Sequence, residues 1–463
     1  RLLQDSDLKA SLMRVHFIAI GGSAMHSLAL ALQRRGDKVT GSDDAIFEPS
    51  KSRLADAGLL PDRMGWDANR VTADIDGVVL GMHARGNNPE LIEAQSLGIQ
   101  IWSYPEFLYQ VTQDKTRVVI GGSHGKTTTT AMLLHVLNHS EVACDYMVGA
   151  NLPMLDHSVN LTEANEFALF EGDEYLSSPI DSRPKFHLYQ ANVALLTGME
   201  WDHVNVFPTE ASYEQAFADF LLSMTVGGAL VYNAEDVPMA QLIEADKSNI
   251  KKFPYHTPPY RIDNGQWIWE SELGDVPLMF MGRHNLSNAE GARWLALEMG
   301  VQEAEFYEAI ASFEGAQQRL EKLAEANRVL YLDFAHAPSK VRATVQAYKA
   351  QFSDRPIWAV LELHTFSSLN ADYITRYAES MDGLAEAKVF FDPEAVKHKQ
   401  LPALDPEQVK AAFGHSVTVY TNSKALREAM DDAPDNAACL MMSSGDMGGW
   451  DVREWAPAWC EEA

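Results

Sequence analysis

A strand, a glycine turn and a helix follow one another near residue 120, and this order constrains the fold more than any other feature of the chain. The β-branched run 118–120 leads into a glycine turn, then into Gly125-Lys126-Thr127 and the apolar pattern of a helix. This is the layout of a phosphate-binding loop, in which main-chain amides and a helix N-terminus attract the phosphate. A loop of this kind favours an α/β fold.

Two side chains of this loop have expected chemical roles. Lys126 would reach the β- and γ-phosphates of a nucleotide, and the hydroxyl of Thr127 would bind Mg²⁺. Ile120 stands where the full motif has its first glycine, so an ordinary glycine turn is the alternative interpretation. The strand before the loop and the helix after it favour the nucleotide site.

The length of the chain predicts more than one domain. At 463 residues it is too long for one compact core, and ~150 residues per domain suggests about three domains. We place them at residues 1–113, 114–325 and 326–463. Strands alternate with helices in each, so the predicted fold class is α/β: a Rossmann-like N-terminal domain, a central P-loop ATPase domain with a mostly parallel sheet, and a Rossmann-like C-terminal domain.

Charge and composition exclude several classes of partner. The net charge of −28 argues against nucleic acid and anionic membranes, because both require a basic surface. No apolar run reaches the ~18 residues of a membrane span, and residues 1–7 do not resemble a signal peptide. The three cysteines lack metal or redox spacing, which fits reduced thiols. We expect a cytoplasmic monomer or weak homo-oligomer, with no nucleic-acid partner and no membrane insertion.

A second glycine turn opens the N-terminal domain. An apolar strand at 15–20 is followed by Gly21-Gly22-Ser23, a helix at 26–35 and a strand at 38–43 that ends in Asp43. This is the βαβ plan of a dinucleotide-type site. Ala19 and Ala24 replace the first and last glycines of the strict fingerprint, so a plain Rossmann-like core is the alternative.

Acidic side chains follow two strands of the central domain. The strand that begins at 167 ends in Glu171, Asp173 and Glu174, and the strand that begins at 193 leads to Asp202 and His203. The carboxyl ends of parallel strands meet at one sheet edge, so we expect these groups near the phosphate loop. Glu171 and His203 are the better candidates for an Mg-nucleotide site. Asp173 and Asp202 could equally be solvated loop acids.

Two asparagines lie one turn apart where the helix near 282–289 begins. Asn285 and Asn288 could present their amides to an adenine edge, and a helix cap is the alternative. In the C-terminal domain we expect strands at 329–333, 356–361, 389–391 and 438–442, with His336 just after the first of them. These strands and the helices between them indicate a small doubly wound sheet.

Taken in order, these segments resemble the Mur ligase family, the ATP-dependent ligases of bacterial cell-wall precursor synthesis. The resemblance covers nearly the whole chain. The segments that carry it are residues 19–23, 122–129, 171–174, 202–203, 284–289, 318–320 and 333–338.

The resemblance implies ATP and Mg²⁺ as cofactors, and UDP-N-acetylmuramate and a murein peptide as small-molecule substrates. The implied catalytic residues are Lys126, Glu171 and His203, and the implied metal ligands are Thr127, Glu171 and His203. The residues implied at the ATP are Gly122, Ser123, His124, Gly125, Lys126, Thr127, Thr128, Asn285, Asn288, Arg319 and Asp333, the last at the ribose or the domain hinge. The residues implied at the UDP-sugar or peptide are Gly21, Gly22, Ser23, Ser42, Asp43, His83, Asn88, His336 and His364, and the last two are also candidates for the base.

The resemblance also implies a reaction. UDP-N-acetylmuramate would be joined through an acyl phosphate to the tripeptide L-alanyl-γ-D-glutamyl-meso-diaminopimelate, in murein recycling. Residues 174–175 and 181–186 favour the tripeptide over L-alanine, which is the alternative acceptor. A nucleotide-binding regulator without catalysis is a second alternative, because Ala19, Leu332 and Ala337 depart from the family pattern. The base and the residues that read the peptide stay open.

Overall fold

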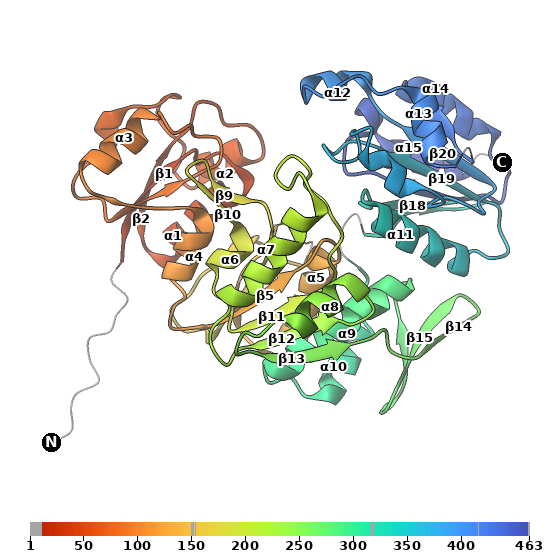
Figure 1. The fold of residues 1–463 in the computed structure, drawn as a ribbon, viewed down its shortest axis with the longest axis horizontal. Helices are drawn as coiled ribbons and strands as arrows, with labels where there is room; N and C mark the ends of the chain where they lie inside the picture. Colours follow the sequence, from red (N-terminus) through yellow and green to blue (C-terminus); the bar gives the residue numbers. More distant parts are fainter. Residues whose placement is uncertain (1–11, 150–151, 153, 316–318, 415, 462–463) are drawn as a thin grey trace.

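The computed structural model describes residues 12–149, 152, 154–315, 319–414 and 416–461, which form three lobes in chain order (Figure 1). Residues 1–7 and Gln318, both used in the sequence analysis, lie outside this part of the chain. Among the described residues, no helix is both long enough and apolar enough to cross a membrane.

The first lobe contains a four-stranded parallel sheet in the order β2-β1-β3-β4. Its elements are β1 (Arg14–Ile18), α1 (Ser23–Arg35), β2 (Lys38–Ser42), α2 (Ser50–Asp56), η1 (Ala68–Arg70), β3 (Gly77–Leu80), α3 (Pro89–Ser96), β4 (Gln100–Trp102) and α4 (Tyr104–Gln110). The strand order reverses between β1 and β3, where open α/β sheets bind their ligands. The glycine turn at 21–23 follows β1 and therefore lies at this point.

The second lobe contains a seven-stranded sheet in the order β13-β12-β11-β5-β8-β6-β7. All neighbours are parallel except β6 and β7. Its main elements are β5 (Thr116–Gly121), α5 (Lys126–His139), β6 (Cys144–Met147), β7 (Val159–Asn160), β8 (Phe167–Glu171), α6 (Lys185–Leu188), β11 (Val193–Leu196), α7 (Glu210–Ser223), β12 (Ala229–Asn233), α8 (Val237–Ala245), β13 (Lys251–Tyr255), α9 (Arg283–Glu298) and α10 (Glu303–Ile310). Since β5 lies between β8 and β11, the phosphate loop and both acidic strand ends share one sheet edge. The mostly parallel sheet is confirmed.

Two antiparallel additions to this lobe were not predicted. One is the hairpin of β9 (Leu176–Ser178) and β10 (Asp181–Pro184). The other is a three-stranded sheet of β14 (Tyr260–Asp263), β15 (Gln266–Ser271) and β16 (Gly274–Leu278), which projects from the lobe in Figure 1. Trp267 and Trp269 lie on one face of β15 and are buried, and Trp269 packs against the Phe306 and Tyr307 rings of α10.

The third lobe contains a six-stranded sheet in the order β17-β18-β22-β19-β20-β21, parallel except for β17 and β18. Its elements are β17 (Glu321–Glu325), β18 (Val329–Asp333), α11 (Pro338–Gln351), β19 (Ile357–Glu362), η2 (Tyr373–Tyr377), β20 (Glu386–Phe390), α12 (Pro393–His398), α13 (Pro406–Ala412), β21 (Thr418–Tyr420), α14 (Ser423–Ala429), η3 (Met430–Asp432), β22 (Ala438–Met442), η4 (Met447–Gly449) and α15 (Val452–Glu461). β17 lies before residue 326 yet pairs with β18, so this sheet starts ahead of the boundary drawn from the sequence.

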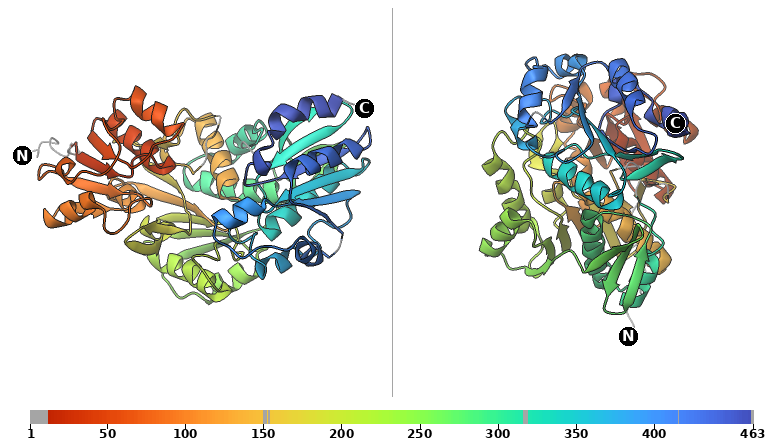
Figure 2. Two further views of the ribbon diagram at one scale, coloured as in Figure 1. Left: turned by 90° about the horizontal axis from the view of Figure 1, so that it is seen from above. Right: turned by 90° about the vertical axis from the view of Figure 1, so that its right-hand side faces the viewer.

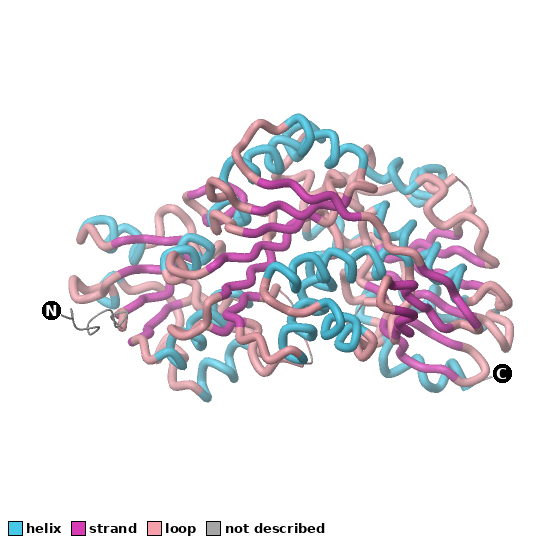
Figure 3. The backbone as a smooth tube through the Cα atoms, turned by 90° about the horizontal axis from the view of Figure 1, so that it is seen from below, coloured by secondary structure: helices cyan, strands magenta, loops and turns pink. Residues whose placement is uncertain are grey.

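The second lobe is packed between the other two, as the views in Figures 2 and 3 show. One cluster of buried apolar side chains continues from the second lobe into the third, and includes Leu286 of α9 together with Val345 and Tyr348 of α11. Another cluster joins the first lobe to the second. The carboxyl edge of the central sheet faces the start of α11, where the Ser339 amide donates to Glu200 of the segment after β11.

Candidate functional site

Glycine sets the shape of the phosphate loop between β5 and α5. Gly122 has a φ of +124° and Gly125 a φ of +80°, a backbone region that other residues rarely adopt. A Cβ on Gly125 would stand 2.5 Å from Asn288 Oδ1, and one on Gly122 would stand 2.2 Å from Thr197 Oγ1. Both positions therefore require glycine for backbone conformation and for space.

Lys126 opens α5 and is held by the loop and by an acidic neighbour. Its Nζ donates hydrogen bonds to the Gly122 carbonyl oxygen at 2.5 Å and to Glu174 Oε2 at 2.9 Å. Burial alone would lower the pKa of Lys126, but the charges of Glu174 and Asp173 outweigh burial and raise that pKa. The lysine is therefore a fixed positive charge at the mouth of the loop.

Glu174 is the acidic centre of the site, and no separate role for it followed from the sequence. Its side chain is 1% exposed, and Oε1 accepts a hydrogen bond from the Tyr213 hydroxyl at 2.8 Å. Burial alone would raise the pKa of Glu174, but the charge of Lys126 and the hydrogen bond with His203 hold it well below its usual range. The only sequence signal was the acidic run 171–174, which does not say which acid faces Lys126.

His203 lies with two carboxylates rather than with Glu171. One ligand atom from each of Asp173, Glu174 and His203 falls within 4.8 Å of the others. His203 also has a φ of +54°, a strained conformation of the kind that clusters at functional sites. Two carboxylates and an imidazole beside a phosphate loop are a donor set for a divalent cation, and the carboxylate oxygens are the ligands that suit Mg²⁺.

Thr127 and Glu171 form a separate pair. Thr127 Oγ1 donates to Glu171 Oε1 at 2.6 Å, and the Gly149 amide donates to Glu171 Oε2 at 2.9 Å. The three metal ligands named from the sequence are therefore divided between two neighbouring groups. Their metal roles stay predictions.

A cleft with about 960 Å³ of open space lies between the phosphate loop and the start of the third lobe. Every residue that the sequence analysis placed at the ATP lines this cleft, except Gly122 in the loop itself. The lining residues are Ser123, His124, Gly125, Lys126, Thr127, Thr128, Thr197, Asn233, Glu235, Thr257, Arg283, His284, Asn285, Ser287, Asn288, Arg319, Asp333, Ala335, Lys340, Ala343 and Thr344. Its size suits a nucleotide.

The two asparagines of α9 line the cleft, and neither caps the helix. The N-cap position is Gly282, which has no side chain to offer. Asn285 donates from Nδ2 to the Met281 carbonyl oxygen at 3.0 Å. Both asparagines are buried. The cap alternative is therefore wrong, and the adenine contact stays a prediction.

Asp333 holds the linker that carries Arg319. Its Oδ2 accepts from the Leu320 amide at 2.7 Å and its Oδ1 from the Ala335 amide at 2.8 Å. Leu320 has a φ of +48°, so the chain turns sharply there. Asp333 also lines the cleft, so its roles at the hinge and at the ribose both stay predictions. The Arg319 guanidinium lies 4.6 Å from the centre of the Phe334 ring and makes no ion pair with any described residue.

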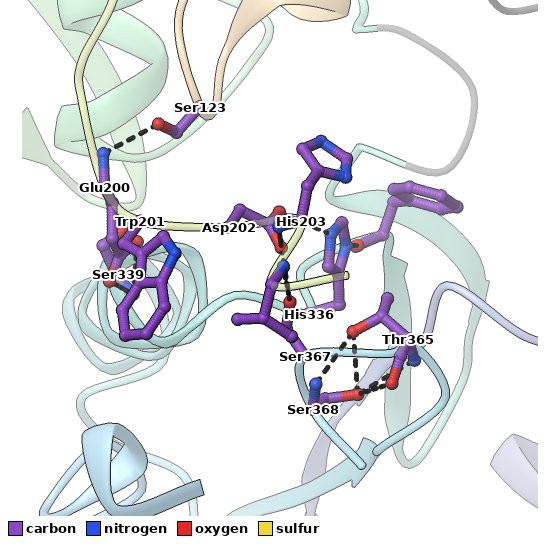
Figure 4. Close-up of polar contacts among 12 residues, drawn as sticks. Ser123, Glu200, Trp201, Asp202, His203, His336, Ser339, Thr365, Ser367 and Ser368 are labelled. Atoms are coloured by element: carbon purple, nitrogen blue, oxygen red, sulfur yellow. Dashed lines mark hydrogen bonds and ion pairs between the residues drawn. The ribbon is translucent and has the colours of Figure 1, made fainter. Parts of the chain in front are cut away.

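The segment after β11 connects the phosphate loop to the third lobe (Figure 4). The Glu200 amide donates to Ser123 Oγ at 2.7 Å, and the Glu200 carboxylate accepts from the Ser339 amide at 3.0 and 3.1 Å. Next along the chain, Asp202 Oδ1 accepts from Ser367 Oγ at 3.1 Å. The lobes are therefore held together directly beside the cleft.

The two histidines proposed at the peptide occupy different places. His336 lies at the boundary between the lobes, with Nε2 3.9 Å from Asp202 Oδ2, and burial together with the charge of Lys340 lowers its pKa. His364 follows β19 and is half-exposed, with Nδ1 3.8 Å from Glu362 Oε1. The structure does not bring them together, and their roles stay predictions.

In the first lobe, the glycine turn and the end of β2 are joined. The Gly21 amide donates to Asp43 Oδ2 at 2.7 Å. Ala19, which replaces the first glycine of the fingerprint, has a φ of +69°, so the backbone keeps the conformation that glycine would favour. Exposed His83 lies beside Gly22.

Two other substrate candidates of this lobe use their side chains within it. Ser42 Oγ donates to Glu90, and Asn88 Oδ1 accepts from the Glu90 amide at 2.9 Å as the N-cap of α3. Both residues are buried. No ligand contact of Ser42, Asn88 or Ser23 follows from these bonds, and their roles stay predictions.

In a comparison with known proteins, three successive parts of the chain match models of the same protein family. Residues 14–116 match the Mur ligase family catalytic domain, residues 120–296 the Mur ligase middle domain, and residues 318–445 the Mur ligase glutamate ligase domain. The UDP-N-acetylmuramate–L-alanine ligase of Arthrobacter sp. (strain FB24) is 29% identical over 434 residues, which cover 91% of this chain and 90% of that protein.

Two solved structures share the fold. A murein peptide ligase from Psychrobacter arcticus 273-4 superposes with a TM-score of 0.64 at 22% identity, over 97% of this chain and 99% of that one. The UDP-N-acetylmuramate-alanine ligase of Thermotoga maritima gives a TM-score of 0.67 at 21% identity, over 94% and 96% of the two chains.

Proposed function

The chain belongs to the Mur ligase family of ATP-dependent ligases, and on that premise we propose that it joins UDP-N-acetylmuramate to the tripeptide L-alanyl-γ-D-glutamyl-meso-diaminopimelate. The products are the amide, ADP and phosphate. The observation that carries this proposal is the cleft, where the phosphate loop, the acidic group at 173–174 and the start of the third lobe face one another.

A division of labour among the lobes follows from this proposal. Residues 1–113 bind the UDP-sugar at the turn 21–23, residues 114–325 bind ATP, and residues 326–463 bind the peptide. The turn follows β1 at the switch point of the first sheet, which supports the first assignment. We place the protein in the cytoplasm, where UDP-sugars and ATP are available together.

The proposed reaction has two chemical steps, and each step requires a different kind of catalysis. The muramoyl carboxylate attacks the γ-phosphorus of ATP, so that ADP leaves and an acyl phosphate forms. The deprotonated amine of the peptide then attacks the acyl carbon, and the tetrahedral intermediate expels phosphate. The first step brings an anion to a polyanion, so charge neutralisation and positioning dominate.

The chain supplies positive charge and shielding for these steps. We propose that Lys126 binds the β- and γ-phosphates, and that Thr127, Glu171, Asp173, Glu174 and His203 would hold Mg²⁺. Bound Mg²⁺ would neutralise phosphate charge. The contacts of Glu200 and Asp202 with the third lobe close the site beside the cleft, which would keep water from the acyl phosphate.

The tripeptide is supported by the segment that follows Glu174. Residues 174–175 and 181–186 resemble the recycling ligases, and β9 and β10 form a hairpin there. Arg183 of the hairpin pairs with Glu106 of the first lobe at 2.9 Å, and Lys185 pairs with Asp173 at 2.9 Å. The hairpin therefore lies between the lobe proposed for the UDP-sugar and the acidic group at 173–174.

L-Alanine is the second candidate acceptor, because the curated relative described above is named as an L-alanine ligase. Phosphate release with UDP-N-acetylmuramate and ATP, measured separately with L-alanine, the dipeptide and the tripeptide, distinguishes the two. We expect release with the tripeptide. Release with L-alanine alone assigns the other reaction, and binding of nucleotides without release with any acceptor assigns a regulator.

A further inference from the structure

We propose that Lys340 binds the γ-phosphate of ATP, and that the third lobe delivers this lysine to the site by packing against the second. The proposal rests on the proposed function and deepens it, because it names the residue that distinguishes ATP from ADP. No role for Lys340 followed from the sequence.

Lys340 stands in the first turn of α11, two residues after Pro338. Its side chain lines the nucleotide cleft together with Lys126 and Arg319. Lys126 belongs to the second lobe and Lys340 to the third. The cleft is therefore completed by a cation that comes from across the lobe boundary.

Some of the cationic side chains along the cleft have an acidic partner within the protein, and Lys340 has none among the described residues. Lys126 pairs with Glu174 at 2.9 Å and Arg283 pairs with Glu235 at 3.0 Å. The side chain of Lys340 makes no hydrogen bond and no ion pair with any residue that the structure describes. Asp333, an acid of the same lining, is already bound to main-chain amides.

An unpaired cation in a confined site is unfavourable unless an anion binds there. Burial and the nearby charges of Arg319 and Lys126 lower the pKa of Lys340 to about 8. A polyphosphate in the cleft would relieve this repulsion. The negative charge that would pair with Lys340 is therefore supplied by the ligand and not by the protein.

The phosphate end of the nucleotide is the better position for this lysine. The charges that act on Lys340 include Lys126, Glu174 and Asp202, which belong to the loop mouth and its acidic neighbours. Lys340 in turn lowers the pKa of His124 in the phosphate loop, after burial as the main cause. These neighbours place it by the terminal phosphate.

Glu200 positions this lysine. Its carboxylate accepts from the amide of Ser339, the residue before Lys340, at 3.0 and 3.1 Å, and also from the Ser339 hydroxyl. The Glu200 amide donates at 2.7 Å to Ser123 of the phosphate loop (Figure 4). One residue therefore ties the phosphate loop to the first turn of α11, in which Lys340 lies.

The test compares two nucleotides on the full-length protein. Equilibrium binding of ADP and of an ATP analogue with a β,γ-imido bridge is measured for the wild type, Lys340→Met, Lys340→Arg and Glu200→Ala. Lys424→Met is the matched control, because Lys424 is 84% exposed on α14 of the same lobe. Thermal unfolding of each variant verifies that it is folded.

We expect Lys340→Met to weaken the ATP analogue about tenfold or more, the size of one charge-assisted contact, and ADP less than about twofold. We expect Lys340→Arg to keep most of the preference for the ATP analogue over ADP. Glu200→Ala should lose this preference, as Lys340→Met does. Lys424→Met should change the affinity for neither nucleotide. Equal weakening of both nucleotides by Lys340→Met, or no weakening of either, overturns the proposal. A wild type that binds neither nucleotide overturns the ATP site itself, and with it the proposed function.

Discussion

Lys126 Nζ lies 2.9 Å from Glu174 Oε2, so a carboxylate from the neighbouring strand end holds the phosphate-loop lysine. The same carboxylate group meets His203, with Nε2 3.5 Å from Glu174 Oε1. Phosphate binding and the acidic group at 173–174 are therefore coupled through one buried side chain.

Replacing the loop lysine separates ATP chemistry from sugar binding. We expect Lys126→Ala to lower the rate of phosphate release by about 10²–10³, because a fixed cation at the developing charge is lost. Binding of UDP-N-acetylmuramate, measured by calorimetry, stays unchanged because its lobe is separate. Lys397→Ala, at a side chain that is 72% exposed, is the control for charge. Equal rates in the two variants would contradict the role of Lys126.

Glu174→Gln changes stability in a pH-dependent way. Lys126 and His203 hold the pKa of Glu174 below its ordinary 4.5, so its contribution to folding is present above that pH and is lost as the pH falls below it. We expect the variant to lose about 3 kcal/mol of unfolding free energy at pH 7, because the partly buried Lys126 loses its carboxylate partner. Urea unfolding should show a smaller loss at pH 4. Glu394→Gln, at a side chain that is 75% exposed, is the control, and a loss independent of pH would rule out the coupling.

Protonation of His203 is expected to lower the rate of phosphate release at acidic pH. Burial alone would lower the pKa of His203, but Glu174 and Asp202 raise it above its ordinary 6.5. The imidazole must be neutral to bind a metal, so we expect phosphate release to fall with acidification from above pH 6.5. Raising the Mg²⁺ concentration should move this limb to lower pH, because the metal competes with the proton. A limb that does not move with Mg²⁺ would argue against a metal at His203.

Gly125→Ala tests the geometry of the loop. Its φ of +80° strains any other residue, and the new Cβ would stand 2.5 Å from Asn288 Oδ1. We expect ADP and ATP binding to weaken by more than about tenfold through the displaced loop and asparagine. Gly58→Ala is a matched control, because Gly58 has a φ of +70° with nothing within 4 Å of the added Cβ. If both variants bind nucleotide normally, the contact between Gly125 and Asn288 does not shape the site.

The local order of residues in the sequence was enough to predict the strands, loop and helix that carry the site. The phosphate loop, the strand ends at 171 and 196 and the start of α9 were predicted, because buried parallel strands read as continuous apolar runs and their ends are marked by polar residues. The residues predicted at ATP line one cleft, apart from Gly122. The boundary at 325/326 was drawn after β17 and not before it, since this edge strand contains polar residues and pairs with β18 of the third lobe.

Contacts between residues far apart in the sequence could not be read in this way. Glu174 and Glu171 lie three residues apart, and only the turn after β8 decides which of them meets Lys126. Lys340 is an ordinary polar residue of an amphipathic helix until Glu200 binds the amide before it. The first contact depends on the path of a turn within one lobe and the second on how two lobes pack, and no local pattern encodes either.

The fate of one oxygen atom tests the ligase reaction most directly. UDP-N-acetylmuramate with ¹⁸O in the muramoyl carboxylate is incubated with ATP, Mg²⁺ and the tripeptide, and the phosphate is analysed by mass spectrometry. Attack of the carboxylate on the γ-phosphorus predicts one ¹⁸O in each phosphate released, together with the amide product. Phosphate without the label, formed at the same rate whether or not the tripeptide is present, would contradict an acyl-phosphate ligase and leave only hydrolysis of ATP.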